Sequence, residues 1–374
     1  MASYQSSSSE GSEDQASNRF TSELSTSVPG VGYSQQKLPE GVASGPSPDK
    51  IASAIHLFRY LFQRCDHNFL RRNLMSNNQK KELAKFNLLY YFRSKEDIES
   101  FLKSYPQYFA FTNETIYNPY YFSDDGLIEL LKQHRIPSEP RTAVPYELIA
   151  SVSECKRHVA RLRDRALRNP PLVLAMDCEG VNLGRYGPLT LLQLGTAEGE
   201  VFIFDILATP NKEDMFIKGG LKGLIEDGNI LKVIHDCRTD QTALAFQFHV
   251  TLTNVFDTST AFMTLCDQFN ILRRPYRPKL VELFSVFGYD AKQKKSLFSY
   301  EQPFGKRPLT SEMLEYAADD VLGLVPLIYE NMNRLISPLW RPFFEAEVNR
   351  SLRESRLRDL HETYKEDRKK SGYN

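Results

Sequence analysis

Three short apolar runs between residues 172 and 206 restrict the possible fold more than any other feature of the sequence. They read LVLAMDC, LTLLQLGT and EVFIFDI, and the turn-prone segments RYGP and AEGE separate them. Apolar runs of this length, bounded by turns, are typical of buried strands. A helix is predicted at GGLKGLIED, then a strand at LKVIHD and a helix at DQTALAFQF. This order predicts an α/β fold with a mixed sheet flanked by helices.

The first run ends in two carboxylates, Asp177 and Glu179, with Cys178 between them. Side chains two apart on a strand point the same way, so both acids share one face while Cys178 faces the other. Burying two ionised carboxylates side by side is costly unless a cation lies between them. Hard divalent cations such as Mg²⁺ prefer oxygen ligands of this kind. The alternative is that the strand ends at Met176 and both acids are solvated.

Two later stretches supply further acids. In VIHDCRTDQTAL, Asp240 follows a strand end by six residues, although an aspartate at a helix start is also a common cap. LTSEMLEYAADDVLGLVPLI predicts a long helix. At about 100° per residue, Tyr316 and Asp320 share a partly buried flank, whereas Asp319 falls on the solvated side with Glu315. Asp320 is therefore the candidate functional residue of this helix.

Together these motifs resemble the DEDDy 3′–5′ exonucleases of the RNase D type, over about residues 170–335. The resemblance rests on D-x-E in the first strand, on Asp240, and on Y-x-x-x-D in the late helix, supported by LTLLQLGT and RPLTSEMLEYAADDV. It implies an RNase H-like sheet. The five family positions are filled by Asp177, Glu179, Asp240, Tyr316 and Asp320.

In such enzymes four carboxylates hold two divalent ions, Mg²⁺ or Mn²⁺, about 3.5–4 Å apart. The resemblance implies that Asp177 bridges both ions, that Glu179 and Asp320 bind the first, and that Asp240 acts on the second through water. One ion activates a water for in-line attack, and the other stabilises the leaving 3′ oxygen. Tyr316 is expected to position that water. It is not assigned as a base, because an unperturbed tyrosine titrates near pH ~10.

Residues 271–300 combine seven basic side chains with interleaved tyrosines and phenylalanines. Basic residues for the backbone and aromatics for unstacked bases are what a single-strand channel needs. We therefore predict nucleic-acid contacts from Arg273, Arg274, Arg277 and Lys279. The alternative is a solvated loop with some aromatics in the core. For Gln193, in the second apolar run, two interpretations stay open: support of the acidic site, or bonding to buried backbone groups.

The sequence before residue 170 predicts accessory segments. IASAIHLFRYLFQRC and KKELAKFNLLYYF favour helices, Ser94 and Asp97 form a capping-box pattern, and YFAF and TIY predict a hairpin. This order is typical of a winged-helix module. ECKRHVARLRDRALR predicts a basic helix that is either a solvated face or a phosphate-facing surface. A winged-helix-like unit before an RNase D-like domain is similar to the Egalitarian group and the related exonuclease 3′–5′ domain-containing proteins.

The chain is predicted to divide into five segments. These are a disordered serine-rich tail (1–49), the winged-helix-like α+β module (50–135), a linker and basic helix (136–168), the DEDDy exonuclease domain (169–340) and a charged C-terminal helix or tail (341–374).

Composition narrows the setting. The 47 basic and 47 acidic residues of the 374-residue chain cancel, so any attraction to nucleic acid must come from local patches. The five cysteines are scattered without a Cys-x-x-Cys pair, which favours reduced thiols in an intracellular protein and argues against structural zinc. No apolar run reaches 18 residues, so no membrane contact is expected. The expected compartment is the cytoplasm, with a nuclear share left open.

We predict a metal-dependent 3′–5′ exonuclease acting on single-stranded RNA, with an N-terminal module that binds nucleic acid or a protein partner. No residue decides between RNA and DNA, because recognition of the 2′-hydroxyl depends on pocket geometry. The main alternative is a non-catalytic RNA-binding adaptor of the Egalitarian type that retains the exonuclease fold. A DNA-directed exonuclease is a further alternative.

Overall fold

The computed structural model describes residues 47–63, 69–117, 124–133, 146–271, 277–288 and 303–357. The unit Met1–Gly45 lies outside these ranges. Nearly all of the predicted serine-rich tail (1–49) and the end of the chain (358–374) therefore lie outside the described residues. Within the described ranges, no helix is both long enough and apolar enough to cross a membrane.

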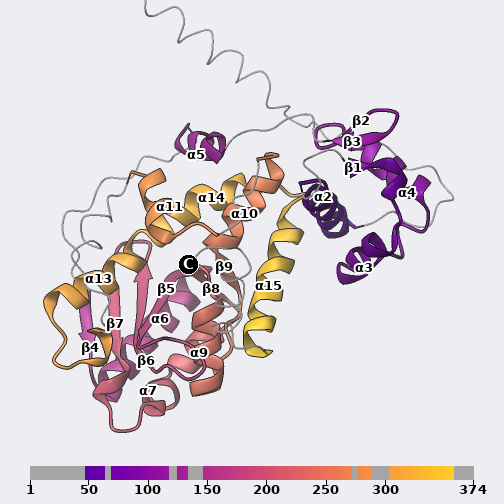
Figure 1. Ribbon diagram of the computed structural model, residues 1–374. Coiled ribbons are helices and arrows are strands. Elements are labelled where there is room, and N and C mark those ends of the chain that lie inside the picture. The colour runs from indigo at the N-terminus through magenta and orange to yellow at the C-terminus, as the bar shows by residue number, and fades with distance from the viewer. Residues whose placement is uncertain are drawn as a thin grey trace, which may run out of the picture. The chain divides into compact units, whose positions relative to one another are not determined.

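A six-stranded mixed sheet, in the order β4-β7-β6-β5-β8-β9, lies at the centre of the C-terminal part (Figure 1). The three apolar runs form β5 (Leu172–Gly180), β6 (Leu189–Thr196) and β7 (Val201–Asp205), which pair antiparallel in succession. β8 (Ile230–Ile234) joins β5 in parallel, and β9 (Val255–Asp257) joins β8 in parallel. The predicted mixed sheet is confirmed.

The sixth strand, β4 (Tyr146–Ile149), pairs in parallel with β7 at the edge of the sheet, where the sequence predicts a linker leading into a helix. Its residues Glu147 and Leu148 are both exposed, so the strand shows no apolar alternation. A short edge strand takes its conformation from the free backbone groups of its neighbour rather than from its own side chains. Its four residues therefore carry no signal that separates a strand from a linker.

Helices cover both faces of the sheet. α13 (Ser311–Leu322) packs on β5, β6 and β7, and a Cβ added to Gly195 of β6 would lie 3.0 Å from the Val321 carbonyl oxygen. α6 (Val152–Arg168) lies on the other face, because its His158 ring is 5.4 Å from the ring of Phe202 on β7. Phe202 pairs with Leu194, whose side chain points away from the Gly195 face. The predicted flanking helices are confirmed.

The predicted basic helix, α6, turns part of its charge toward the protein. Arg165 is paired with Glu198 at 2.6 Å and also with Glu200, and Arg161 lies 3.1 Å from Glu200. Both glutamates belong to the turn between β6 and β7. The charges of these two arginines are thus neutralised within the fold. For these residues, this favours a solvated helix face over a phosphate-facing surface.

The long predicted helix changes pitch after Leu322. α13 ends at Leu322, with Gly323 as its C-cap, and a π-helical segment, η4 (Leu324–Tyr329), leads into α14 (Glu330–Leu335). The amide of Ile328 donates to the Gly323 carbonyl oxygen at 3.3 Å, which spans five residues instead of four. Pro326 lies inside this segment, has no amide hydrogen, and crowds the carbonyl four residues before it. The wide turn thus coincides with a residue that cannot donate a backbone hydrogen bond.

The remaining elements of the C-terminal part are listed by their bounds. They are α7 (Glu213–Ile217), α8 (Leu221–Ile225), α9 (Arg238–Phe248), α10 (Thr258–Gln268), α11 (Leu280–Val286), α15 (Arg341–Leu357), and the 3-10 helices η2 (Ile206–Ala208) and η3 (Pro303–Gly305).

The N-terminal module follows the order helix, strand, two helices and hairpin that a winged helix has. Its elements are α2 (Pro48–Gln63), β1 (Phe69–Leu70), η1 (Arg71–Asn73), α3 (Asn77–Lys85), α4 (Lys95–Lys103), β2 (Ala110–Phe111), β3 (Thr115–Tyr117) and the additional helix α5 (Asp124–Gln133). The capping box is present: the Asp97 amide donates to the Ser94 hydroxyl at 3.1 Å, and the Ser94 amide to the Asp97 carboxylate at 2.9 Å. The module boundaries stay a prediction.

A buried ion pair joins α2 to the C-terminal part. Arg59, which is 2% exposed, donates to the Asp267 carboxylate at 2.9 Å, and His56 lies 2.8 Å from the same carboxylate. Asp267 belongs to α10, and α2 also packs along α15. Although the sequence predicts a separate module, α2 contributes to the hydrophobic core that it shares with α10 and α15.

Candidate metal centre

Strand β5 continues past Met176, and both Asp177 and Glu179 are paired with residues of β6. Asp177 pairs with Gln193 and Glu179 with Leu191, before a register shift at Gly180. The alternative in which the strand ends at Met176 is therefore wrong. Both acids are half-buried, and the intervening Cys178 is buried on the opposite face.

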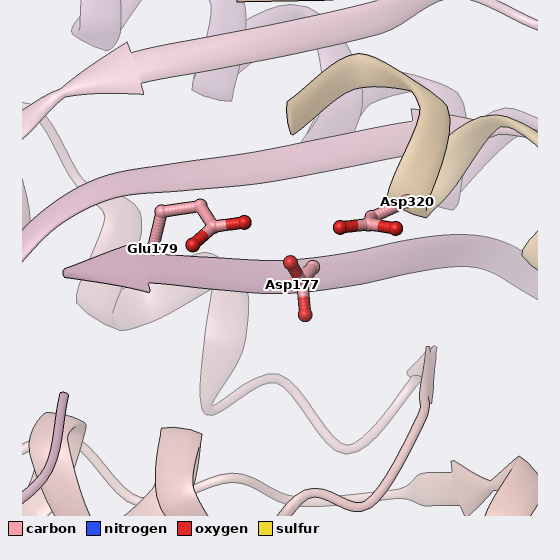
Figure 2. A group of neighbouring side chains, drawn as sticks. All are labelled: Asp177, Glu179 and Asp320. Atoms are coloured by element: carbon pink, nitrogen blue, oxygen red, sulfur yellow. The ribbon is translucent and has the colours of Figure 1, made fainter. Parts of the chain in front are cut away.

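Asp320 of α13 completes a group of three carboxylates. One oxygen from each of Asp177, Glu179 and Asp320 lies within 4.8 Å of the other two. Figure 2 shows the two strand carboxylates and the helix carboxylate turned toward one another. α13 brings Asp320 here because it lies on the same face of β5 and β6 as the two strand acids. Three convergent hard oxygen donors fit a divalent cation such as Mg²⁺ or Mn²⁺.

The expectation that Asp319 is solvated is wrong. Asp319 is 4% exposed, nearly as buried as Asp320 at 5%, whereas Glu315 on the same side of the helix is exposed. The periodicity gave the direction of each side chain correctly but not what covers it. α13 packs on β5, β6 and β7, and every residue from Ala317 to Leu322 is buried, so little of its second half reaches water.

Asp240 lies in the first turn of α9 and is 5% exposed. It does not belong to the group of three carboxylates, whose oxygens lie within 4.8 Å of one another. Its Oδ1 has no hydrogen-bond partner among the described residues. Burial raises the pKa of Asp240 to about 7, and the neighbouring carboxylates of Asp236 and Asp257 act in the same direction. A buried carboxyl with an unsatisfied oxygen suits a further contact to a hydrated ion.

Asp257 was not singled out from the sequence, yet it fixes the chain that leads into Asp240. Its carboxylate is fully buried and accepts from the amides of Asp236 at 3.2 Å and Cys237 at 3.0 Å. It also accepts from the Thr260 amide at 3.0 Å, which caps α10. The short apolar strand ending in Asp257 before Thr258-Ser259-Thr260 is a helix-cap pattern that could have revealed it.

Tyr316 is half-buried on α13, one helical turn before Asp320, and its ring centroid lies 5.9 Å from that of Phe304. The side chain is therefore held by packing on the same helix that supplies Asp320. Gln193 is fully buried on β6 directly opposite Asp177. Both predicted positions adjoin the acidic group, and the assigned roles stay predictions.

The predicted nucleic-acid residues fall into three situations. Arg277 is half-buried and donates to the hydroxyls of Ser259 at 3.3 Å and Thr260 at 3.0 Å. Lys279 is exposed at the start of α11. Arg273 and Arg274 lie outside the described residues. Arg277 thus holds α10, and a contact with nucleic acid would have to compete with these two bonds.

A surface cavity of about 570 Å³ opens in the N-terminal module, lined by residues that include Phe69, Asn73, Gln79 and Lys81. None of the acids described above lines it. The side chains able to hold a metal ion gather at β5 and α13 and not at this cavity, so the candidate site is placed at β5 and α13.

Comparison with known proteins bears on residues 147–337, which match a family model described as a 3′-5′ exonuclease. This match covers just over half of the chain and includes all five predicted site residues. Its start falls at β4, the strand that the sequence had not revealed. β4 and α6 therefore lie within the matched region.

Three curated relatives match part of the chain. The human piRNA biogenesis protein EXD1 is 29% identical over 179 residues, covering 45% of this chain and 34% of that protein. Its Xenopus laevis counterpart is 30% identical over 164 residues, covering 41% and 36%. The Egalitarian protein homolog of Caenorhabditis elegans is 29% identical over 195 residues, covering 47% and 32%. The predicted similarity to the Egalitarian and exonuclease-domain group is confirmed, and the match spans about a third of each relative.

Among solved structures, Escherichia coli RNase D, an exoribonuclease involved in structured RNA processing, is 22% identical with a TM-score of 0.46. The match covers 57% of this chain and 51% of that one. The catalytic core of RRP6 from Trypanosoma brucei is 23% identical with a TM-score of 0.44, covering 60% and 54%. Both likenesses are partial, each covering little more than half of either chain.

Proposed function

This chain belongs to the 3′–5′ exonuclease family, and from that membership we propose that it removes nucleotides from the 3′ end of single-stranded RNA in a reaction that depends on divalent metal ions. The observation that carries the proposal is the convergence of Asp177, Glu179 and Asp320 within 4.8 Å. A fold without turnover has no need to hold three carboxylates together, since their mutual repulsion costs stability. RNA is preferred to DNA because the EXD1 relatives are named for piRNA biogenesis.

The donor set indicates which residues would hold the ions. Asp177, Glu179 and Asp320 offer convergent oxygens, and the unsatisfied Oδ1 of Asp240 suits a contact through water. When bound, Mg²⁺ or Mn²⁺ supplies a water of lowered pKa and stabilises charge on the leaving oxygen. The chain's own remaining task is to orient the attacking water, which we assign to the Tyr316 hydroxyl.

RNA held at this site would need cations along its path. We assign this contact to Arg273, Arg274 and the exposed Lys279. Reversing these three charges should weaken single-strand binding and flatten its salt dependence, because fewer counterions are released. Arg277→Glu serves as a contrast, since it should also lower the melting temperature through its lost bonds to α10. An unchanged salt slope in the triple variant would remove these residues from the RNA path.

A non-catalytic RNA-binding adaptor is the second candidate. It is favoured by a relative named as an Egalitarian protein homolog. In either case the N-terminal module is proposed to bind a protein. Its helix α4 carries three acidic and two basic residues, so it presents no strongly basic face to a phosphate backbone.

The decisive experiment incubates the full chain with 3′- and 5′-labelled single-stranded RNA and DNA, in Mg²⁺, Mn²⁺ or EDTA. If the protein is an exonuclease, mononucleotides should be released from the 3′ end of RNA, and only when Mg²⁺ or Mn²⁺ is present. In parallel, Mn²⁺ should raise the melting temperature of wild type, and Asp177→Asn should abolish most of that rise. RNA binding without release in either metal would establish the adaptor instead.

A further inference from the structure

Gln193 occupies a position on the acidic face that the proposed function leaves unused. It pairs with Asp177 across the β5–β6 ladder, and directly opposite side chains in such a ladder point to the same face with Cβ atoms about 5 Å apart. That face lies under α13, as the close approach of Val321 to Gly195, two residues further along β6, shows. The amide is therefore enclosed between the strand that carries Asp177 and the helix that carries Asp320.

The surroundings of this amide are unusual for a buried glutamine. Gln193 is 0% exposed, and neither its Nε2 nor its Oε1 has a hydrogen-bond partner among the described residues. Gln241 of α9, equally buried, bonds at both ends: its Nε2 donates to the Val250 carbonyl at 3.3 Å, and its Oε1 accepts from the Leu252 amide at 2.8 Å. A buried polar group left without partners costs stability, so an apolar residue would serve packing better at Gln193.

We infer that Gln193 is a positioning residue for Asp177: its amide N–H donates to a carboxylate oxygen of Asp177 when divalent ions occupy the acidic group. The inference rests on the proposed function. Metal-ligating carboxylates generally need such outer partners, which fix their orientation and hold them ready to bind. Asp177 is the acid assigned to contact both ions, and Gln193 is the uncommitted donor directly opposite it in the neighbouring strand.

The opposing interpretation gives Gln193 a purely structural role. In that case its amide would be satisfied within the fold in solution, as Gln241 is, and removing it would cost stability without touching metal binding. The two interpretations predict different changes in melting temperature for Gln193→Met. This substitution keeps the length of the side chain but deletes both polar atoms. In the metal-free protein, a positioning residue without partners should give an unchanged or raised melting temperature on replacement by methionine.

The test measures Mn²⁺ affinity, by titration calorimetry or the signal of free Mn²⁺, together with the metal-free melting temperature. Gln193→Met should bind Mn²⁺ about 10–100-fold more weakly than wild type while melting no lower. Gln193→Asn, which keeps the amide but shortens its reach, should also weaken binding. Leu194→Met, on the opposite face of the same strand, should leave affinity unchanged, and Gln241→Met should lower only the melting temperature.

Wild-type affinity retained in Gln193→Met, with Mn²⁺ binding intact in wild type, would overturn the inference and leave the proposed function standing. A lower metal-free melting temperature with unchanged affinity would assign Gln193 to structure alone. If wild type itself binds no Mn²⁺, the proposed function and this inference fail together. If Gln193→Met does not fold, Gln193→Asn decides by the same affinity criterion.

Discussion

Asp320 and Glu315 lie on the same helix but differ in what surrounds them, and this difference predicts opposite outcomes for the same chemical change. Asp320→Asn removes one oxygen charge from the group of three and should lower 3′-terminal release by orders of magnitude while leaving RNA binding near wild type. Glu315→Gln alters an exposed carboxylate and should change neither. Rates of labelled mononucleotide release for both variants check this. Equal activity in Asp320→Asn and wild type would require another third ligand.

At the same scale, the sequence predicted the directions of side chains better than their burial. Asp177 and Glu179 were placed correctly because strand alternation is a local geometric rule. Asp319 was misplaced because helical periodicity gives only a direction, and burial depends on which distant elements pack there. Asp257 was overlooked for a related reason: its three amide partners come together only in the folded chain.

Among the elements, the contact between β6 and α13 sets how closely Asp320 approaches the strand acids. A Cβ at Gly195 would lie 3.0 Å from the Val321 carbonyl oxygen and 3.3 Å from the Ala175 Cβ, so Gly195→Ala must shift the helix by a few tenths of an ångström. We expect a loss of about 1–3 kcal/mol of stability and a fall in turnover. Gly228→Ala, with nothing within 4 Å, should be tolerated in both respects. Melting curves and release rates for the pair test this. A neutral Gly195→Ala would show that α13 has room to move.

Strand β8 contains a buried lysine whose charge is costly. Lys232 is 1% exposed, and burial lowers its pKa from 10.5 to about 8, although its Nζ donates to the carbonyls of Asp227 and Ile230, each at 2.7 Å. The unfolded chain therefore binds more protons than the folded one between pH 8 and 10.5. Stability should rise with pH across that window, and below it the penalty is fully present.

Lys232→Met removes this titration. Chemical denaturation of wild type and variant from pH 7 to 10.5 should show wild type gaining up to about 3 kcal/mol relative to the variant as pH rises. The comparison cancels the other groups that titrate in the same window. Parallel pH profiles for the two proteins would mean that the lysine stays charged at no cost.

At the scale of the whole molecule, the buried pair of Arg59 and Asp267 makes α2 part of the C-terminal core. Arg59→Met removes the guanidinium from the buried Asp267 carboxylate, and should cost about 3–5 kcal/mol. We expect wild type to unfold in one transition and the variant in two. Arg72→Met, at an exposed arginine of the same module, should leave one transition. Calorimetry of both variants measures this, and a single unshifted transition in Arg59→Met would contradict it.

The packing of α2 on α10 and α15 could not be predicted from the sequence, whereas most of the sheet could. The sheet and its flanking helices can be predicted because runs such as residues 189–196 have a local pattern of apolar residues that is typical of one kind of element. Strand β4 does not, because its pairing partner β7 lies more than fifty residues away and alone makes it a strand. The docking of α2 depends on a salt bridge spanning 208 residues, which no local pattern encodes.

The π-helical turn after Asp320 has a consequence for how this chain tolerates changes in length. A turn that closes over five residues holds one residue more than an α-helical turn, so η4 is a place where a single codon could be lost and an ordinary helix would form. Such a deletion would leave α14 and its buried Asn331 near their present orientation to the sheet, because the residue lost is the one that widens the turn. The spacing from the Thr310 cap to Asp320 would not change. A deletion in η4 would thus change the packing only at the wide turn and would spare both the acids and α14.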